Sequence, residues 1–188
     1  MEALLVLEMQ NDLIYADLAV TIKRGQLIIP NIQKILRAAR EKGRPVIYVN
    51  LLMHPQDPII LKNKLPHHCL IGSPGAEVIE ELRPQQGDHV VNIHRMDGFL
   101  DSNLGFLLRD ILEVEGIIVT GVSTGVGCLL TALGAIQRGM KAVLVSDACA
   151  TYTEDRHEIA LEFFRKNLGF VGLKTTKEVV AMLYSDGS

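Results

Sequence analysis

The sequence predicts an α/β fold in which helices cover both faces of a parallel sheet. Continuous apolar runs, such as 3–7 and 117–119, have the length and composition of strands that are buried on both faces. Stretches with apolar residues at helical spacing separate these runs, and right-handed crossovers then place the strands in parallel. The length of 188 residues and the 48% hydrophobic content predict one domain, residues 1–188, with a sizeable core.

The stretch from Gly116 to Arg138 is where we expect the chemistry. A β-branched run leads through a turn of small residues, 120–125, into a predicted helix. Five apolar residues recur there at helical spacing: Val126, Leu129, Leu130, Leu133 and Ile136. Such a turn directs backbone N–H groups at one point, which favours an anion or a developing oxyanion. A membrane span is the alternative for this uncharged stretch, but its five glycines and its change of period favour a soluble core element.

The other elements follow from the same patterns. We expect strands at 45–49, 88–92, 141–145 and 170–172. Helices are predicted from Pro30 to Gly43, over 74–82, after 101–103 and over 176–183. Capping-box spacing at 151–154 precedes one more helix, with four apolar residues on one face: Ile159, Ala160, Phe163 and Phe164. The proline-rich segment 50–73 reads as a long connection, of the kind that forms lids or substrate walls.

Composition and charge exclude several classes of function. A net charge of -3 without a basic run gives no electrostatic footprint for nucleic acid. Met1 and Glu2 lead directly into a predicted strand rather than into a signal peptide, so we expect a cytoplasmic protein. Three cysteines outside any CxxC motif suggest reduced thiols rather than disulfides or a zinc site.

The histidines of the 50–73 connection raise the question of a metal. Metal ligands could come from His54, His67 and His68, but the residue two positions before His54 is Leu52 rather than an acid. Solvated or interface histidines are therefore the preferred interpretation. We expect neither a metal nor another cofactor.

Several segments together carry a family resemblance. They include LLVLEMQNDLI, HHCLIGSPGAEVIEEL, VVNIHRMDGFLDSNLGFLLR and IIVTGVSTGVGCLLTALGA. Over nearly its whole length the chain resembles the isochorismatase-like cysteine hydrolases, the group of nicotinamidases, isochorismatases and N-carbamoylsarcosine amidases. The resemblance implies a three-layer αβα, Rossmann-like sheet of about six parallel strands, assembly into homodimers or homotetramers, and hydrolysis of small non-peptide amides.

In that family an aspartate after the first strand, a lysine after the third strand and a cysteine at the start of the central helix form a catalytic triad. Glu8, Ile93 and Gly127 stand at the matching positions. Thr124 and Thr131 keep the family's separation on either side of the cysteine position, so a one-residue shift does not align Cys128. The resemblance therefore implies a site in which all three triad members are replaced.

Two substitutes for the missing groups stay open. Cys128 is either a relocated nucleophile or a small buried residue, because consecutive helical residues point about 100° apart. His94 is either a stand-in for the lysine or turned to the other face of its strand.

The rest of the expected pocket combines charged residues with the turn. Glu8 tends toward a raised pKa if it is buried without a lysine. Arg95 and Asp97 are pocket candidates, with a salt bridge between the two as the simpler alternative. The predicted oxyanion turn consists of Val122, Ser123 and Thr124.

Three functions are compatible with this pattern. The preferred one is a non-catalytic family member that keeps a small-molecule pocket. The second is an active hydrolase of an amide, carbamoyl or ester bond, which uses Cys128 or a water activated by Glu8 and Asp97. The third is a module that binds and regulates an active relative through the 50–73 connection or through an oligomer face.

Overall fold

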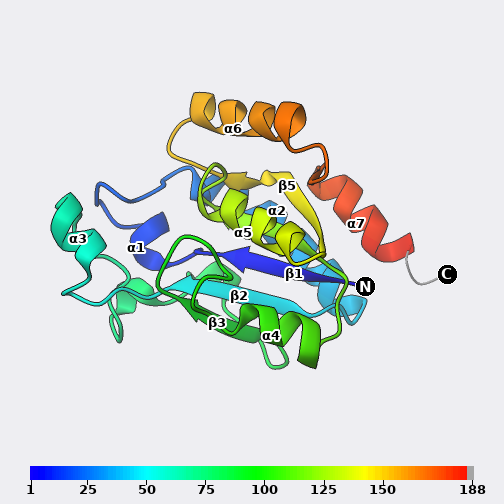
Figure 1. Cartoon of the computed structure of the whole chain (residues 1–188), viewed down its shortest axis with the longest axis horizontal. Coiled ribbons are helices and arrows are strands. Elements are labelled where there is room, and N and C mark those ends of the chain that lie inside the picture. Colours follow the sequence, from blue (N-terminus) through cyan, green and yellow to red (C-terminus); the bar gives the residue numbers. More distant parts are fainter. Residues whose placement is uncertain (186–188) are drawn as a thin grey trace.

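The computed structural model describes residues 1–185 and confirms the predicted α/β architecture (Figure 1). The sheet contains β1 (Glu2–Leu7), β2 (Val46–Leu51), β3 (His89–Ile93), β4 (Gly116–Val122), β5 (Lys141–Ala150) and β6 (Gly172–Lys174). All neighbouring strands pair in parallel, in the order β3-β2-β1-β4-β5-β6. This order confirms the six-stranded Rossmann-like sheet that the family resemblance implies.

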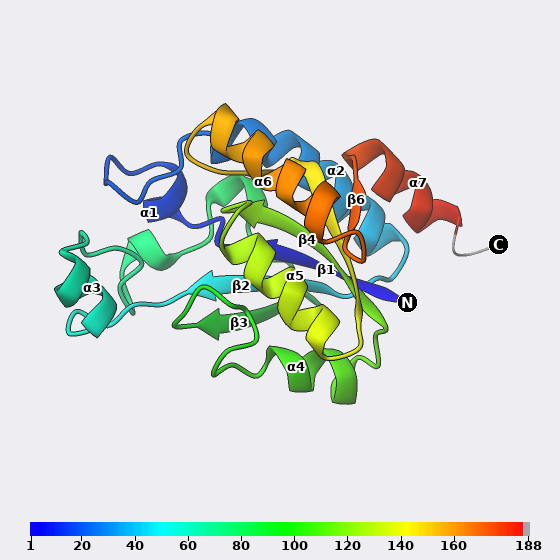
Figure 2. The same ribbon diagram turned by 45° about the horizontal axis from the view of Figure 1, so that its top comes forward.

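Helices form a layer on each face of the sheet, as Figure 2 shows from a second direction. One face carries α2 (Gly25–Glu41) and α7 (Thr176–Ser185), which share a core cluster with Leu4 and Val6. The other face carries α4 (Leu104–Phe106), α5 (Gly127–Gln137) and α6 (Glu154–Asn167), which pack on Leu5 and Leu7. Successive side chains of β1 point to opposite faces of the sheet, so they contribute to two separate hydrophobic cores.

One glycine is required where β4 passes β1. Gly121 has a φ of +110°, and a Cβ atom there would lie 2.1 Å from the carbonyl oxygen of Leu7. Any other residue would force the two strands apart. Gly121 thus allows the ends of β1 and β4 to lie together.

The expected helix boundaries are wrong in two places. The helix expected from Pro30 begins five residues earlier, at Gly25. Pro30 is tolerated inside it because both the ring and Gln26, whose carbonyl loses its helical partner, are exposed to water. The segment 74–82 forms two 3₁₀ turns, Pro74–Ala76 and Glu80–Leu82, because Val78 between them pairs with Gln10 in an isolated bridge.

The expected long connection is partly ordered. Its first two residues belong to β2, and it contains α3 (Pro58–Asn63). The Asp57 carboxylate caps this helix by accepting from the N–H of Ile59 at 2.9 Å. Another short helix, α1 (Asn11–Ile14), lies in the loop after β1.

The C-terminal elements are shifted relative to the prediction. The last strand begins at Gly172 rather than at 170, and β5 extends to Ala150 because its register against β4 shifts between Val119 and Gly121. In α6 the cap is Thr153, and the buried face consists of His157, Leu161 and Phe164. Of the expected apolar face Phe164 is buried, but the prediction is wrong for Ile159 and Phe163, which are 69% and 46% exposed.

The membrane alternative for the central stretch is wrong as well. Its first part, Gly116–Val122, is a buried strand of the sheet. Over residues 1–185, no helix combines the length and the apolar character that crossing a bilayer requires.

Candidate functional site

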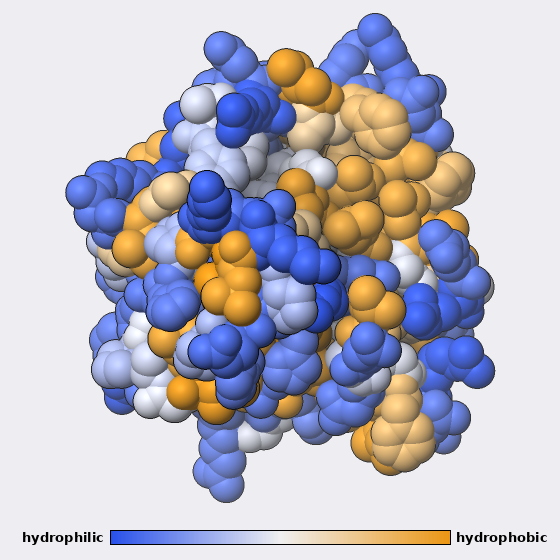
Figure 3. All heavy atoms as spheres, turned by 60° about the vertical axis from the view of Figure 1, so that its left-hand side comes forward, coloured by the Kyte–Doolittle hydropathy of each residue, from blue (hydrophilic) through white to orange (hydrophobic). Residues whose placement is uncertain are grey.

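The site lies where the strand order reverses. From β1 the chain moves to β2 on one side, whereas β4 continues to β5 on the other. Ligands in open parallel sheets bind in the crevice outside the carboxyl ends of the strands at such a switch point. Here those ends carry Glu8, which follows β1, and the turn of residues 123–126, which joins β4 to α5. Figure 3 looks onto this side of the molecule, where hydrophobic side chains gather in one area and hydrophilic ones in another.

The Glu8 side chain fills the space that a side chain on residue 127 would need. Glu8 has a φ of +54°, and its N–H donates to the carbonyl of Val49 at 2.9 Å. Its Oε1 atom lies 2.7 Å from the point that a Cβ atom on residue 127 would occupy. Since real Cβ atoms do not approach oxygen so closely, the glutamate fits because residue 127 is glycine. The carboxyl group thus lies at the position from which a side chain of residue 127 would extend.

One oxygen of the Glu8 carboxyl is buried without a partner. The residue keeps some exposure, but its Oε1 atom has none and forms no hydrogen bond within residues 1–185. Desolvation raises the pKa of Glu8 to about 8. Ile93, where the resemblance predicts that a lysine is replaced, is an apolar residue fully buried in the same core cluster as Leu51 and Phe99, so it gives no charge in return. The carboxyl is therefore predominantly protonated at neutral pH.

All three cysteines are buried. Cys128 belongs to the core cluster that contains Ala132, and its N–H donates to Ser123 at 3.1 Å. A hydrogen bond to Cys149 and burial raise the pKa of Cys128 well above its ordinary value. The Cys149 thiol in turn donates to the carbonyl of Val119 at 3.5 Å. A reactive thiolate needs a lowered pKa, so this setting disfavours Cys128 as a nucleophile.

Cys69 also lies close enough to Glu8 for the Glu8 charge to affect the pKa of its thiol. Its N–H donates to the Asp12 carboxylate at 2.8 Å, and the residue is fully buried. Burial raises the pKa of the Cys69 thiol, and the charges of Asp12 and Glu8 raise it further. Cys69 and Asp12 therefore tie the loop after α3 to the loop after β1.

The predicted oxyanion turn is held by a residue that sequence reasoning missed. His157 on α6 contacts the Thr124 hydroxyl at 2.8 Å through Nδ1 and the Ser146 carbonyl at 3.0 Å through Nε2. The N–H of Thr124 donates to the carbonyl of Ala150 at 2.9 Å. Burial lowers the pKa of His157, so the imidazole is neutral and accepts from the threonine hydroxyl. The only sequence signal was a polar residue at helical spacing from Leu161.

Residues 122–124, the predicted oxyanion turn, are buried. Their role in binding an oxyanion stays a prediction. Val122 is fully buried, and Ser123 is 9% exposed. The Ser123 carbonyl accepts from the N–H groups of Val126 and Cys128 at 3.1 Å each, which fixes the first turn of α5.

Arg95 and Asp97 are not paired with each other. The Arg95 guanidinium donates to Asp57 at 2.9 Å, so the expected salt bridge to Asp97 is wrong. Asp97 accepts from the N–H of Phe99 at 2.9 Å and lies 3.0 Å from the point that a Cβ atom on Gly134 would occupy. Gly134 is two helical turns, about 10 Å, beyond the start of α5. The structure therefore does not bring Asp97 together with Glu8.

The histidines before and after α3 have local partners. The N–H of Gln56 donates to His54 at 3.1 Å, and His68 contacts the Pro66 carbonyl at 2.7 Å. His94 contacts the Leu52 carbonyl at 2.8 Å and is exposed, while His67 is exposed on the surface. In the described part of the chain, no group of three or more His, Cys, Asp or Glu side chains is arranged to hold a metal ion.

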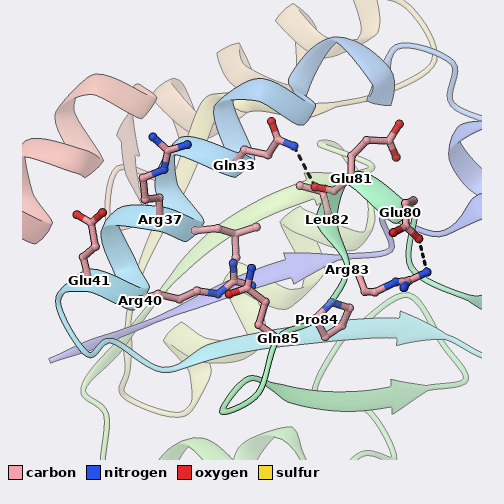
Figure 4. A pocket seen from close by; sticks show the side chains of 11 residues that line it. Gln33, Arg37, Arg40, Glu41, Glu80, Glu81, Leu82, Arg83, Pro84 and Gln85 are labelled. Carbon is pink, nitrogen blue, oxygen red and sulfur yellow. Dashed lines mark hydrogen bonds and ion pairs between the residues drawn. The ribbon is translucent and has the colours of Figure 1, made fainter.

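A separate cavity of about 610 Å³ lies between α2 and the segment 80–85 (Figure 4). Gln33 donates across it to the carbonyl of Glu81 at 3.0 Å. Arg40 lines the cavity, but two of its hydrogen bonds go to Asp88, at 3.3 and 2.6 Å. The Arg40 guanidinium is therefore committed to the protein itself, and none of the predicted site residues lines this cavity.

Comparisons with known proteins show the family and the fold. A family model described as the isochorismatase domain matches residues 2–176. An isochorismatase of Bacillus subtilis is 31% identical over 138 residues, which cover 71% of this chain and 43% of that protein. The structure of N-carbamoylsarcosine amidase from Thermoplasma acidophilum is similar with a TM-score of 0.82 at 28% identity, covering 94% of this chain and 97% of that one. A cysteine hydrolase from Pseudomonas syringae pv. phaseolicola 1448A gives a TM-score of 0.87 at 28% identity, covering 98% and 92%.

Proposed function

This chain belongs to the isochorismatase family, and we propose that it keeps the family's small-molecule site without thiol-based hydrolysis. The observation that carries the proposal is the distance of 2.7 Å between Glu8 Oε1 and the place of a Cβ on Gly127. A carboxyl group, and not a thiol, lies at the position of the family nucleophile. The degenerate triad of Glu8, Ile93 and Gly127 then forms a binding site for a small molecule.

The surroundings of Cys128 support this proposal. A nucleophilic thiol needs an adjacent base and a lowered pKa, whereas burial and Cys149 raise the pKa of Cys128. Loss of even one member of a catalytic group usually costs several orders of magnitude in rate.

Turnover of a compound panel tests the proposal. The panel contains nicotinamide, N-carbamoylsarcosine, small esters and isochorismate, offered to the wild type and to Cys128→Ala. We expect no turnover that depends on Cys128. Amide or carbamoyl hydrolysis that disappears in Cys128→Ala would overturn the proposal.

A second candidate is hydrolysis that uses the Glu8 carboxyl as an acid. It is favoured by the raised pKa of Glu8, because a protonated carboxyl is available as a proton donor near pH 7. Isochorismate contains an enol ether, which is cleaved after protonation and needs no thiol. Isochorismate turnover that persists in Cys128→Ala and is lost in Glu8→Gln would support this candidate over a purely binding role.

We also propose that the chain forms a homodimer or homotetramer. The support is a set of exposed apolar side chains: Val126 just before α5, Leu130 on α5, and Ile159 and Phe163 on α6. The turn before α5 lies against α6, since a Cβ on Gly125 would lie 3.3 Å from Ala160. Exposed apolar patches commonly mark contacts between proteins. A cytoplasmic location stays a prediction.

A further inference from the structure

Another cavity lies between α2 and α7, which pack together on one face of the sheet (Figure 2). Its volume is about 450 Å³, within the range of about 300 to 1,000 Å³ that is typical of small-molecule sites. None of the predicted site residues lines it. The cavity is therefore separate from the site around Glu8.

The charges that line this cavity are mostly positive. Lys34 and Arg37 lie one turn apart on α2, so their side chains share one face of that helix. Lys177 lines the cavity from the first turn of α7. In the described part of the chain, Asp147 on β5 is the one acid that lines it, which leaves an excess of two positive charges.

The acid, the amide and the phenol of the cavity already have partners. Asp147 Oδ1 accepts from the N–H and the hydroxyl of Thr176, at 2.6 and 2.8 Å, and so satisfies the N-terminus of α7. Asn31 donates to the Asp147 carbonyl at 2.7 Å. The Tyr184 hydroxyl donates to Glu41, which does not line the cavity. These groups therefore serve the fold of the protein itself.

The positively charged donors are largely free. Within residues 1–185 the side chains of Arg37 and Lys177 form no hydrogen bond or ion pair, and Figure 4 draws Arg37 without a bonded neighbour. Lys34 forms one long hydrogen bond, 3.4 Å, to Asn31. An arginine has five donors, a lysine has three, and neither can accept. Spare donors with an excess of positive charge favour an anion that accepts several hydrogen bonds at once.

Apolar groups also line the cavity: Ala38, Val180 and the ring of Tyr184. Two contacts hold the Tyr184 ring, since its hydroxyl bonds to Glu41 and the Lys42 ammonium lies 4.9 Å from its centre. A ring held in this way offers a surface against which a flat group can pack. The cavity thus combines a cationic part with an apolar part.

Beyond the proposed function, we propose that the cavity between α2 and α7 binds small phosphate monoesters that carry a flat apolar group, such as aryl or nucleoside monophosphates. The phosphate of a monoester carries a charge of about −1.5 to −2 at pH 7, which matches the excess positive charge of the cavity. Its three free oxygens surround the phosphorus atom, so donors from two helices can reach it together. A carboxylate has one charge and two oxygens in one plane, and fits less well.

Nuclear magnetic resonance on the ¹⁵N-labelled full chain tests this inference, with phenyl phosphate as the probe. The titration is done at about pH 7.5, where the phosphate is a dianion, and at low ionic strength, because salt screens exposed charges. We expect saturable shifts of backbone signals on α2 and α7, with unchanged signals around Glu8. No saturable shift, or shifts around Glu8 in place of those on the two helices, would overturn the inference.

Two further probes test the two parts of the ligand. Inorganic phosphate lacks the ring, whereas benzoate keeps the ring but has a planar group with one charge. Each should bind more weakly than phenyl phosphate, by about three- to tenfold. Equal affinity for inorganic phosphate or for benzoate would overturn the assignment to a phosphate monoester.

Paired charge variants locate the site. Arg37→Gln/Lys177→Gln removes one free cation from each helix and should weaken phenyl phosphate binding at least about tenfold. The matched control, Lys62→Gln/Arg109→Gln, removes the same residue types from exposed positions that do not line the cavity, and should bind as the wild type does. Equal weakening in both double variants would indicate attraction by net charge alone and would overturn the inference. None of these positions belongs to the predicted site around Glu8, so the proposed function stands or falls independently.

Discussion

Replacement of Gly127 by alanine should be less favourable for stability when residue 8 is glutamate than when it is aspartate. The new methyl group would lie 2.7 Å from Glu8 Oε1, several tenths of an ångström closer than contact allows. The carboxyl must swing away, and an off-rotamer side chain costs about 0.5 to 1.5 kcal/mol. Against this, alanine at a helical glycine without positive φ stabilises by about 0.4 to 1 kcal/mol. In the wild type, Gly127→Ala should therefore be neutral or mildly destabilising.

Glu8→Asp should remove the clash. Aspartate is shorter by one methylene, so its carboxyl withdraws about 1.5 Å from residue 127. In that background Gly127→Ala should be stabilising, which gives a coupling free energy of about 1 kcal/mol between the two positions. This exceeds the deviation of about 0.3 to 0.5 kcal/mol that independent sites show.

Urea unfolding, followed by circular dichroism, measures the four proteins of this cycle. Gly134→Ala is the matched control, because its methyl group would meet Phe99 at 2.7 Å and has no contact with Glu8. Its cost should be the same in both backgrounds. Coupling below about 0.3 kcal/mol between residues 8 and 127 would refute the shared-space argument.

Other predictions concern ionisation, thiols and assembly. Since the folded pKa of Glu8 is raised to about 8 from 4.5, its stabilising contribution is complete below pH 4.5 and is lost as pH rises to 8; urea unfolding should show this loss, up to about 4 kcal/mol, in the wild type and not in Glu8→Gln. Native protein should resist iodoacetamide at all three cysteines, and mass spectrometry showing rapid labelling of Cys128 would contradict its burial. Thr124→Val should cost about 1 to 2 kcal/mol by leaving His157 without its donor, whereas Thr124→Ser should cost less; equal losses in urea unfolding would contradict a role for the hydroxyl. Ile159→Lys should dissociate the proposed oligomer in analytical ultracentrifugation, and an unchanged mass would argue against α6 as the contact.

Sequence patterns predicted the fold because burial dominates it. The run from Ala3 to Leu7 is fully buried, and the strand-to-helix change of period near Ser123 matches the end of β4 and the start of α5. Boundaries failed where one interaction outweighed local preference. Pro30 lies inside α2 because its ring and Gln26, whose carbonyl loses its helical partner, are both exposed to water. Val78 interrupts a predicted helix because it pairs with Gln10.

The candidate site was only partly predictable. The strand-end rule brought Glu8 together with the turn before α5, but no sequence pattern reveals that Glu8 takes the space above Gly127. That contact depends on the close approach of two strands that are more than 100 residues apart. His157 was missed for a similar reason, because its partners Thr124 and Ser146 come from different elements. Arg95 pairs with Asp57, which precedes α3. The sequence suggested Asp97 as its partner instead, because Asp97 is only two residues away.

The most direct test of a carboxyl-centred site is the turnover of N-carbamoylsarcosine and nicotinamide by the wild type, Cys128→Ala and the triple variant Glu8→Asp/Ile93→Lys/Gly127→Cys. The triple variant includes Glu8→Asp because a thiol on residue 127 has no room beside glutamate. We predict no thiol-dependent hydrolysis by the wild type and measurable hydrolysis by the triple variant. Wild-type turnover that is abolished by Cys128→Ala would contradict the account, since a buried, protonated thiol would then be the nucleophile.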